Sequence, residues 1–122
     1  MISTEQERAK NAWKVANDKE NKNKEFKNLA KGAPALIMSN GLMPSLAFWQ
    51  SKKAYQPLVN ALLGWLKERK LVKNIDFYDA MQDLQRSDSD KYMRVTEETL
   101  EYLKWLRNFV GAVVKDDSIK EQ

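Results

Sequence analysis

Two residue types that carry much of protein chemistry are missing from this sequence of 122 residues, which contains no cysteine and no histidine. Their absence excludes disulfides, thiol nucleophiles, the usual zinc sites and imidazole acid or base catalysis. Carboxylates that bind a hard cation remain possible, as do lysine or tyrosine acting alone. The composition therefore argues against an enzyme.

Long apolar runs are missing as well. No segment approaches the roughly 18 apolar residues that indicate a membrane span, and the polar start of the chain lacks the hydrophobic region of a signal peptide. The chain is 43% hydrophobic and 31% charged, a balance typical of a globular protein with one core. We therefore expect a cytoplasmic protein with a single domain over residues 1–122.

Apolar residues recur at steps of three and four along most of the chain, and no stretch alternates in the way a strand requires. The fold class that this pattern predicts is all-α, a compact bundle of about six helices. Ser3, Asp76 and Thr96 are expected to cap helices, because each precedes acidic residues in a first turn. Trp13 is expected to be a core anchor, and residues 115–122 a frayed polar tail.

Two stretches are expected to interrupt the helices. Residues 17–24 contain no apolar residue, so we expect an exposed connector or an exposed extension of the first helix. Pro34 removes one hydrogen bond from the helix that follows, which predicts a kink or break near Lys31.

A tight corner follows this helix. The apolar run ends at Asn40-Gly41, where glycine can adopt the left-handed conformation that closes a helix. Pro44 suits the first turn of a new helix because its missing N–H is not needed there. That short apolar helix leads to Lys52 and Lys53. The pattern predicts a buried corner that presents a basic tip.

Charge is divided along the chain more strongly than its net charge of +4 suggests. Residues 44–74 hold six basic residues and one acidic residue, whereas residues 75–102 hold eight acidic and three basic residues. Such asymmetry indicates one surface for a polyanion and another for a basic neighbour. Two ordinary solvated helix faces would produce the same counts, and this alternative stays open.

The acidic segment contains one candidate metal site. Asp79 and Asp83 lie four residues apart after Asp76, a spacing that can hold Mg²⁺. The first turn of a helix also favours acidic residues, and no histidine or lysine base accompanies these three. We therefore expect no metal and no other cofactor, with a metal-dependent nuclease as the alternative.

Three blocks of the sequence resemble a known family. They are Gln-Glu-Arg-Ala at residues 6–9; Pro-Ala-Leu-Ile, Asn-Gly-Leu, Leu-Ala-Phe and Ser-Lys-Lys within residues 34–53; and residues 92–109. In this order and at this spacing they resemble the small all-helical subunit of Cmr-type (type III-B) CRISPR effector complexes. Ala33 replaces the leucine typical of the family, and Asn108 replaces an often basic residue.

The resemblance implies a non-catalytic subunit of a ribonucleoprotein. It would stack on copies of itself and on the backbone subunits of the complex, with guide RNA and target RNA as further partners and no membrane. Cleavage would belong to neighbouring subunits. Recognition would not depend on RNA sequence, because guide pairing supplies the sequence and the protein neutralises phosphates.

The resemblance and the charge pattern together suggest the RNA contacts. The expected contacts to the RNA backbone are Lys52, Lys53, Arg94 and Arg107, with Lys27, Lys31 and Lys104 behind them. As an alternative, Arg94 or Arg107 could pair with Glu97, Glu98 or Glu101 across a helix turn. Two other classes of protein also stay open: a helical DNA-binding regulator and a pure scaffold without RNA contact.

Overall fold

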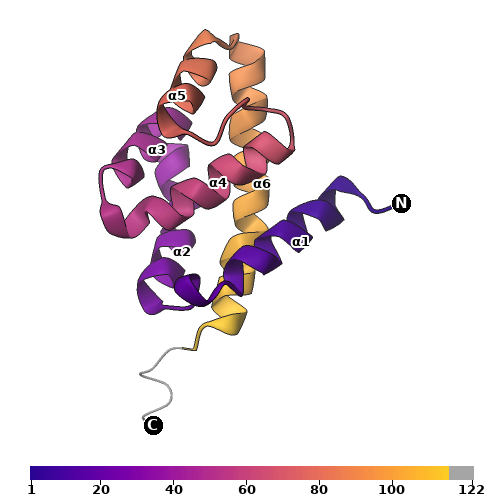
Figure 1. The fold of residues 1–122 in the computed structure, drawn as a ribbon, viewed down its shortest axis with the longest axis vertical. Coiled ribbons are helices and arrows are strands. Elements are labelled where there is room, and N and C mark those ends of the chain that lie inside the picture. The colour runs from indigo at the N-terminus through magenta and orange to yellow at the C-terminus, as the bar shows by residue number, and fades with distance from the viewer. Residues whose placement is uncertain (116–122) are drawn as a thin grey trace.

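The architecture is a bundle of helices (Figure 1), described here for residues 1–115 of a computed structural model. The expected tail at 115–122 lies outside this range except for Lys115. Within residues 1–115, six α-helices and two short 3₁₀ helices alternate with turns, and no strand is present. In chain order they are α1 (Thr4–Ala16), η1 (Lys19–Asn21), α2 (Lys24–Asn40), α3 (Leu42–Gln50), η2 (Lys53–Tyr55), α4 (Gln56–Glu68), α5 (Phe77–Arg86) and α6 (Ser89–Val113). The all-α prediction is confirmed.

The longest helix, α6, forms the axis of the molecule (Figure 1). It packs most extensively against α1 and α2. Its buried face repeats at steps of three and four residues, which is the period that keeps side chains on one side of a helix. The residues of this face are Val95, Thr99, Tyr102, Leu103, Leu106 and Val110.

Helix α4 supplies the other large contribution to the core, as its dense apolar sequence predicts. Six of its side chains are buried, and Trp65 stacks on Tyr102 of α6 with ring centroids 5.4 Å apart. The buried apolar residues form a single cluster. A core of this kind stabilises the fold mainly by removing apolar surface from water.

Of the three residues expected to cap helix starts, two do so and one does not. Ser3 accepts a hydrogen bond from Gln6 N in a capping box, and Asp76 accepts one from Asp79 N, so both are confirmed. The prediction for Thr96 is wrong, because α6 begins two turns earlier behind the cap Asp88. Thr96 lies within the helix, where its hydroxyl donates to the Tyr92 carbonyl oxygen at 3.0 Å.

Of the expected kink or break near Lys31, the break is wrong, since α2 is a continuous helix with Pro34 inside it. Proline removes one backbone donor, yet Ala30, Ala33 and Ile37 are buried on both sides of it. Their packing holds the two halves of the helix together. The predicted stop is confirmed: Gly41 has φ of 93° and donates its N–H to the Ile37 carbonyl oxygen at 2.7 Å.

Two further expectations from the sequence need correction. Trp13 is not a core anchor, because the residue is 49% exposed. The connector after α1 is not wholly exposed: Asn21 is buried, and its side-chain amide donates to the Val15 carbonyl oxygen at 3.0 Å. That hydrogen bond allows a polar side chain to be buried at little cost. Among residues 1–115, no helix is both long and apolar enough to cross a membrane.

Candidate nucleic-acid interface

The basic tip predicted after the corner is present. Helix α3 ends at Gln50, and the chain then turns through Lys52 into η2. The turn is fixed by backbone hydrogen bonds from Lys52 N to the Trp49 carbonyl oxygen at 3.1 Å and from Tyr55 N to the Lys52 carbonyl oxygen at 3.0 Å. The side chains of Lys52 and Lys53 are exposed, and neither forms an ion pair within residues 1–115. A rigid backbone therefore presents two adjacent charges to solvent.

A second group of basic residues lies where α2 and α6 meet. The two helices run antiparallel. At the start of α2, Lys27 Nζ donates to the carbonyl oxygen of Val114 at the end of α6, at 3.1 Å. Just after the end of α2, Met43 N donates to Oη of Tyr92, in the first turn of α6, at 3.0 Å. Arg107 lies seven residues, or two turns, before Val114 and so on the same side of α6. Lys31 lies one turn after Lys27 on the same side of α2. We refer to Lys27, Lys31 and Arg107 as the basic seam.

Helix α2 separates these two groups. Glu25, Leu29 and Leu36 of α2 line a groove that also includes Phe48 and Tyr55 of the α3–η2 corner. Lys27 and Lys31 are rotated away from these α2 residues, since positions two apart on a helix point in roughly opposite directions. The basic tip and the basic seam thus lie on opposite flanks of α2.

The remaining two candidates, Arg94 and Lys104, lie elsewhere on α6 with acidic side chains nearby. Arg94 is turned by about 140° from Arg107 around α6, by the 3.6-residue period. It lines an open cleft of about 440 Å³ in which both charges are present, together with Glu97, Glu98, Glu101, Arg8, Arg69 and Leu71. Lys104 forms an exposed ion pair with Glu101 at 3.2 Å. The seven residues chosen from the sequence therefore occupy separate places on the surface.

The best-defined polar contact of the molecule was not found from the sequence. Arg8 of α1 donates from Nε and Nη2 to the two carboxylate oxygens of Glu98, at 2.6 and 2.9 Å. Trp65 of α4 donates its indole N–H to Glu98 Oε2 at 2.9 Å. Glu98 therefore pairs with Arg8 rather than with Arg94 or Arg107. No local signal identifies a partner ninety residues away.

The electrostatics of this contact follow from its geometry. Burial works to raise the pKa of Glu98, but the hydrogen bonds from Arg8 and Trp65 outweigh it and hold that pKa below its ordinary value. The hydrogen bond to Glu98 raises the pKa of Arg8 further, against the effect of burial. Burial also raises the pKa of Tyr102, whose hydroxyl donates to Asn11 Oδ1 at 2.6 Å. All three groups therefore keep their usual charge states at neutral pH.

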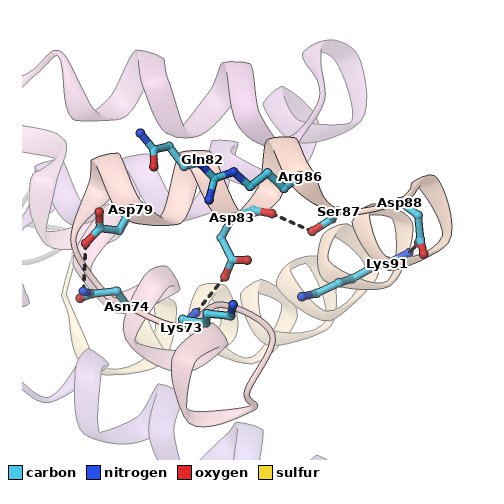
Figure 2. Close-up of a pocket in the computed structure, with 9 residues that line it drawn as sticks. All are labelled: Lys73, Asn74, Asp79, Gln82, Asp83, Arg86, Ser87, Asp88 and Lys91. Carbon is cyan, nitrogen blue, oxygen red and sulfur yellow. Dashed lines mark hydrogen bonds between the residues drawn. The ribbon is translucent and has the colours of Figure 1, made fainter.

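The acidic residues of α5 line another cleft, an open space of about 580 Å³ (Figure 2). Asp83 accepts a hydrogen bond from Lys73 N at 2.9 Å, and Asp79 accepts one from Asn74 Nδ2 at 3.0 Å. Both carboxylates thus hold the preceding loop against the helix. Among residues 1–115, no group of three or more acidic side chains is arranged to bind a metal ion.

These features define a class of protein: a small all-helical domain with one apolar core, whose open clefts and basic groups lie on its surface. The sequence model of the CRISPR-associated protein family Cas_Cmr5 matches residues 4–113. The chain therefore belongs to this family, and the resemblance seen in the sequence is confirmed.

Individual relatives agree with this assignment. A curated protein named CRISPR system Cmr subunit Cmr5, from Thermus thermophilus, is 28% identical over 94 residues, which cover 75% of this chain and 77% of that protein. An X-ray crystal structure of a CRISPR-associated Cmr5 family protein from the same organism has a TM-score of 0.77 to this chain. That similarity covers 93% of this chain and 100% of the other at 24% identity, and it supports the fold.

Proposed function

We propose that this chain is the non-catalytic small subunit of a type III-B CRISPR (Cmr) ribonucleoprotein effector that acts in antiviral defence in the cytoplasm. Its partners are the backbone and other subunits of the complex, copies of itself in a stack, and the guide and target RNA. Membership of the Cas_Cmr5 family supports the place in the complex. Cleavage of RNA then belongs to other subunits.

The observation that carries the RNA contact is the exposed lysine tip. Lys52 and Lys53 project from a backbone held by hydrogen bonds, so only their side chains have to be ordered when they bind a phosphate. Lysines in such positions neutralise phosphates without reading bases. The seam of Lys27, Lys31 and Arg107 provides a second row of charge. Arg94 contributes from a cleft of mixed charge, and Lys104 from an exposed ion pair with Glu101.

Contacts of this kind depend strongly on salt. Each phosphate neutralised on a single strand lowers the slope of log affinity against log salt by about 0.7. With about three contacts per subunit, affinity falls roughly 20-fold between 50 and 200 mM salt. A contribution of this subunit that does not vary with salt would contradict the proposal.

The test is a reconstitution of the effector with guide RNA, in which target-RNA affinity is measured for four preparations. They contain the wild-type chain, the double variant Lys52→Glu/Lys53→Glu, the control Lys19→Glu/Lys22→Glu, or no copy of this chain. The control makes the same change of charge at two exposed lysines of the connector after α1. We expect omission and the first variant to weaken binding alike, with the control close to wild type.

Other outcomes point to a scaffold or to a different family role. If Lys52→Glu/Lys53→Glu assembles and binds target RNA as the wild type does, the tip makes no RNA contact and a pure scaffold is the better description. If the wild-type chain fails to join the complex, its proposed place in the effector is wrong. The non-catalytic role is tested separately: the purified chain should not cleave RNA when Mg²⁺ is added.

A further inference from the structure

Trp13 belongs to a cluster of aromatic rings on the surface between α1 and α6. Its ring meets that of Phe109 edge to face, with centroids 5.1 Å apart and planes at 83°. Trp105 lies 5.7 Å from the same phenylalanine ring. Phe109 and Trp105 are half-buried and pack against the core, whereas Trp13 is 49% exposed. The cluster is thus packed against the core on one side and exposed to solvent on the other.

Lysines border this cluster. Lys10 lies one turn before Trp13 on the same face of α1, and Lys14 lies one turn after Lys10. Both are exposed, and neither forms an ion pair within the described part of the chain. On α6, Glu101 lies one turn before Trp105 on the same face, and its charge is offset by an ion pair with Lys104 at 3.2 Å. The surroundings of the aromatic rings therefore favour an anionic partner.

An open aromatic ring with lysines beside it is the arrangement that binds single-stranded nucleic acid. Every base has a flat face that can stack on an aromatic side chain, while lysines neutralise the neighbouring phosphates. We propose that Trp13, supported by Phe109 and Trp105, is a stacking platform for unpaired bases of single-stranded RNA. The inference rests on the proposed RNA-binding function and adds a contact to bases, which none of the basic residues provides.

The charge around the cluster favours RNA over a protein partner. Binding of an apolar protein segment is favoured by aliphatic and neutral surroundings. Here at least two unpaired lysines next to the contact would have to lose bound water, which weakens such binding. RNA instead gains from these charges. A protein that binds the same cluster is the alternative, and the following experiment distinguishes it from RNA.

The test uses the full chain and two single-stranded RNA probes of 12 nucleotides. One is oligouridine, and the other is the same oligomer without the bases of its central nucleotides. Affinity is measured at about 50 and 200 mM salt. The variants are Trp13→Ala, the conservative Trp13→Phe and, as a control, Tyr78→Ala, which removes a tyrosine that is 74% exposed on α5. The double variant Lys52→Glu/Lys53→Glu is measured beside them.

We expect Trp13→Ala to bind oligouridine about tenfold more weakly, which lies within the range of one base stacked on an aromatic ring. The factor should be the same at both salt concentrations, because stacking involves no counterion release. Trp13→Phe should stay within about threefold of wild type, and Tyr78→Ala should be unchanged. Removing bases from the probe should weaken binding to wild type but not to Trp13→Ala.

Fluorescence gives a second readout. Of the four tryptophans, Trp49 and Trp65 are only 1% exposed. Quenching by RNA therefore reports on Trp13 and Trp105, and most of it should be lost in Trp13→Phe. Quenching that persists unchanged in this variant would overturn the platform.

Three results would overturn the inference in different ways. If Trp13→Ala binds like wild type while Lys52→Glu/Lys53→Glu binds more weakly, the platform is wrong and the phosphate contacts stand. If Trp13→Ala binds RNA normally but fails to enter the reconstituted effector, the cluster is a protein interface. If the wild-type chain does not bind the probe, the platform is wrong, and the effector reconstitution alone decides the proposed function.

Discussion

Arg8 and Glu98 form a two-point ion pair across ninety residues of sequence, with Nε–Oε2 and Nη2–Oε1 distances of 2.6 and 2.9 Å. Their side chains are 19% and 11% exposed, so the pair is largely removed from water. The indole of Trp65 completes the site from α4. One carboxylate thus ties α1, α4 and α6 together at the edge of the core.

This pair should contribute more to stability than any other ion pair among residues 1–115. Replacing Glu98 by alanine leaves the Arg8 guanidinium and the Trp65 indole N–H without their acceptor, so we expect the free energy of unfolding to fall by about 2–4 kcal/mol. Glu7→Ala is the control, because it removes the exposed pair with Arg69 at 3.3 Å. That change should cost less than about 1 kcal/mol. Urea unfolding of both variants measures the difference, and equal losses would contradict the assignment.

The same carboxylate predicts how stability varies with acid. The pKa of Glu98 is lower in the folded chain than its ordinary value of 4.5, so as the pH falls the unfolded state takes up the proton first. The stabilisation from the pair is therefore complete above about pH 5 and is lost as the pH falls through the folded pKa. We expect the difference in unfolding free energy between wild type and Glu98→Gln to shrink between about pH 5 and 3. A difference that stays constant over this range would show that the charge of Glu98 is not responsible.

The corner between α2 and α3 depends on a glycine. Gly41 has φ of 93° and ψ of 164°, a combination that is essentially restricted to glycine. Gly41→Ala should lower the free energy of unfolding by about 1–3 kcal/mol. The matched control is Gly32→Ala, since Gly32 lies within α2 and an added Cβ there meets nothing within 4 Å. This second change should stabilise the helix by about 0.5–1 kcal/mol. Thermal unfolding compares the two, and a loss of stability in both would argue against backbone conformation as the cause.

Lys27 and Lys31 should behave differently although both are candidate RNA contacts. Lys27 donates to the Val114 carbonyl oxygen at the end of α6, where a cation also suits the helix dipole. Lys27→Met, which keeps the apolar stem, should cost about 0.5–1.5 kcal/mol of stability. Lys31→Met should stay within about 0.5 kcal/mol, because Lys31 is exposed and makes no such bond in the described residues. If denaturant unfolding finds no difference, the contact between Lys27 and α6 does not contribute in solution.

Local rules predicted much of the fold. Apolar residues spaced three and four apart identified an all-α chain, the cap at Ser3 placed the first helix, and the glycine and proline of the corner placed the turn between α2 and α3. These signals act within about one helix turn, which is why the sequence alone contains them.

The wrong predictions came from local signals with more than one outcome. Thr96 followed by acidic residues is typical of a cap, but the same residues are tolerated inside a helix when Asp88 starts it earlier. Pro34 weakens a helix, but the burial of α2 on both sides of it prevents a break. For Pro34, packing against the rest of the chain outweighed a local preference, and for Thr96 an earlier cap in the same chain segment did.

The site was harder to predict than the fold. The helical class, the helix ends at Ser3 and Gly41, and the exposed lysine pair could be predicted from the residues, because each depends on near neighbours in the chain. The pairing of Glu98 with Arg8, the surface position of Trp13 and the separation of the basic groups by α2 became evident from the folded chain. Those facts depend on which helix faces are buried against one another, and that is set by packing between residues far apart in the sequence.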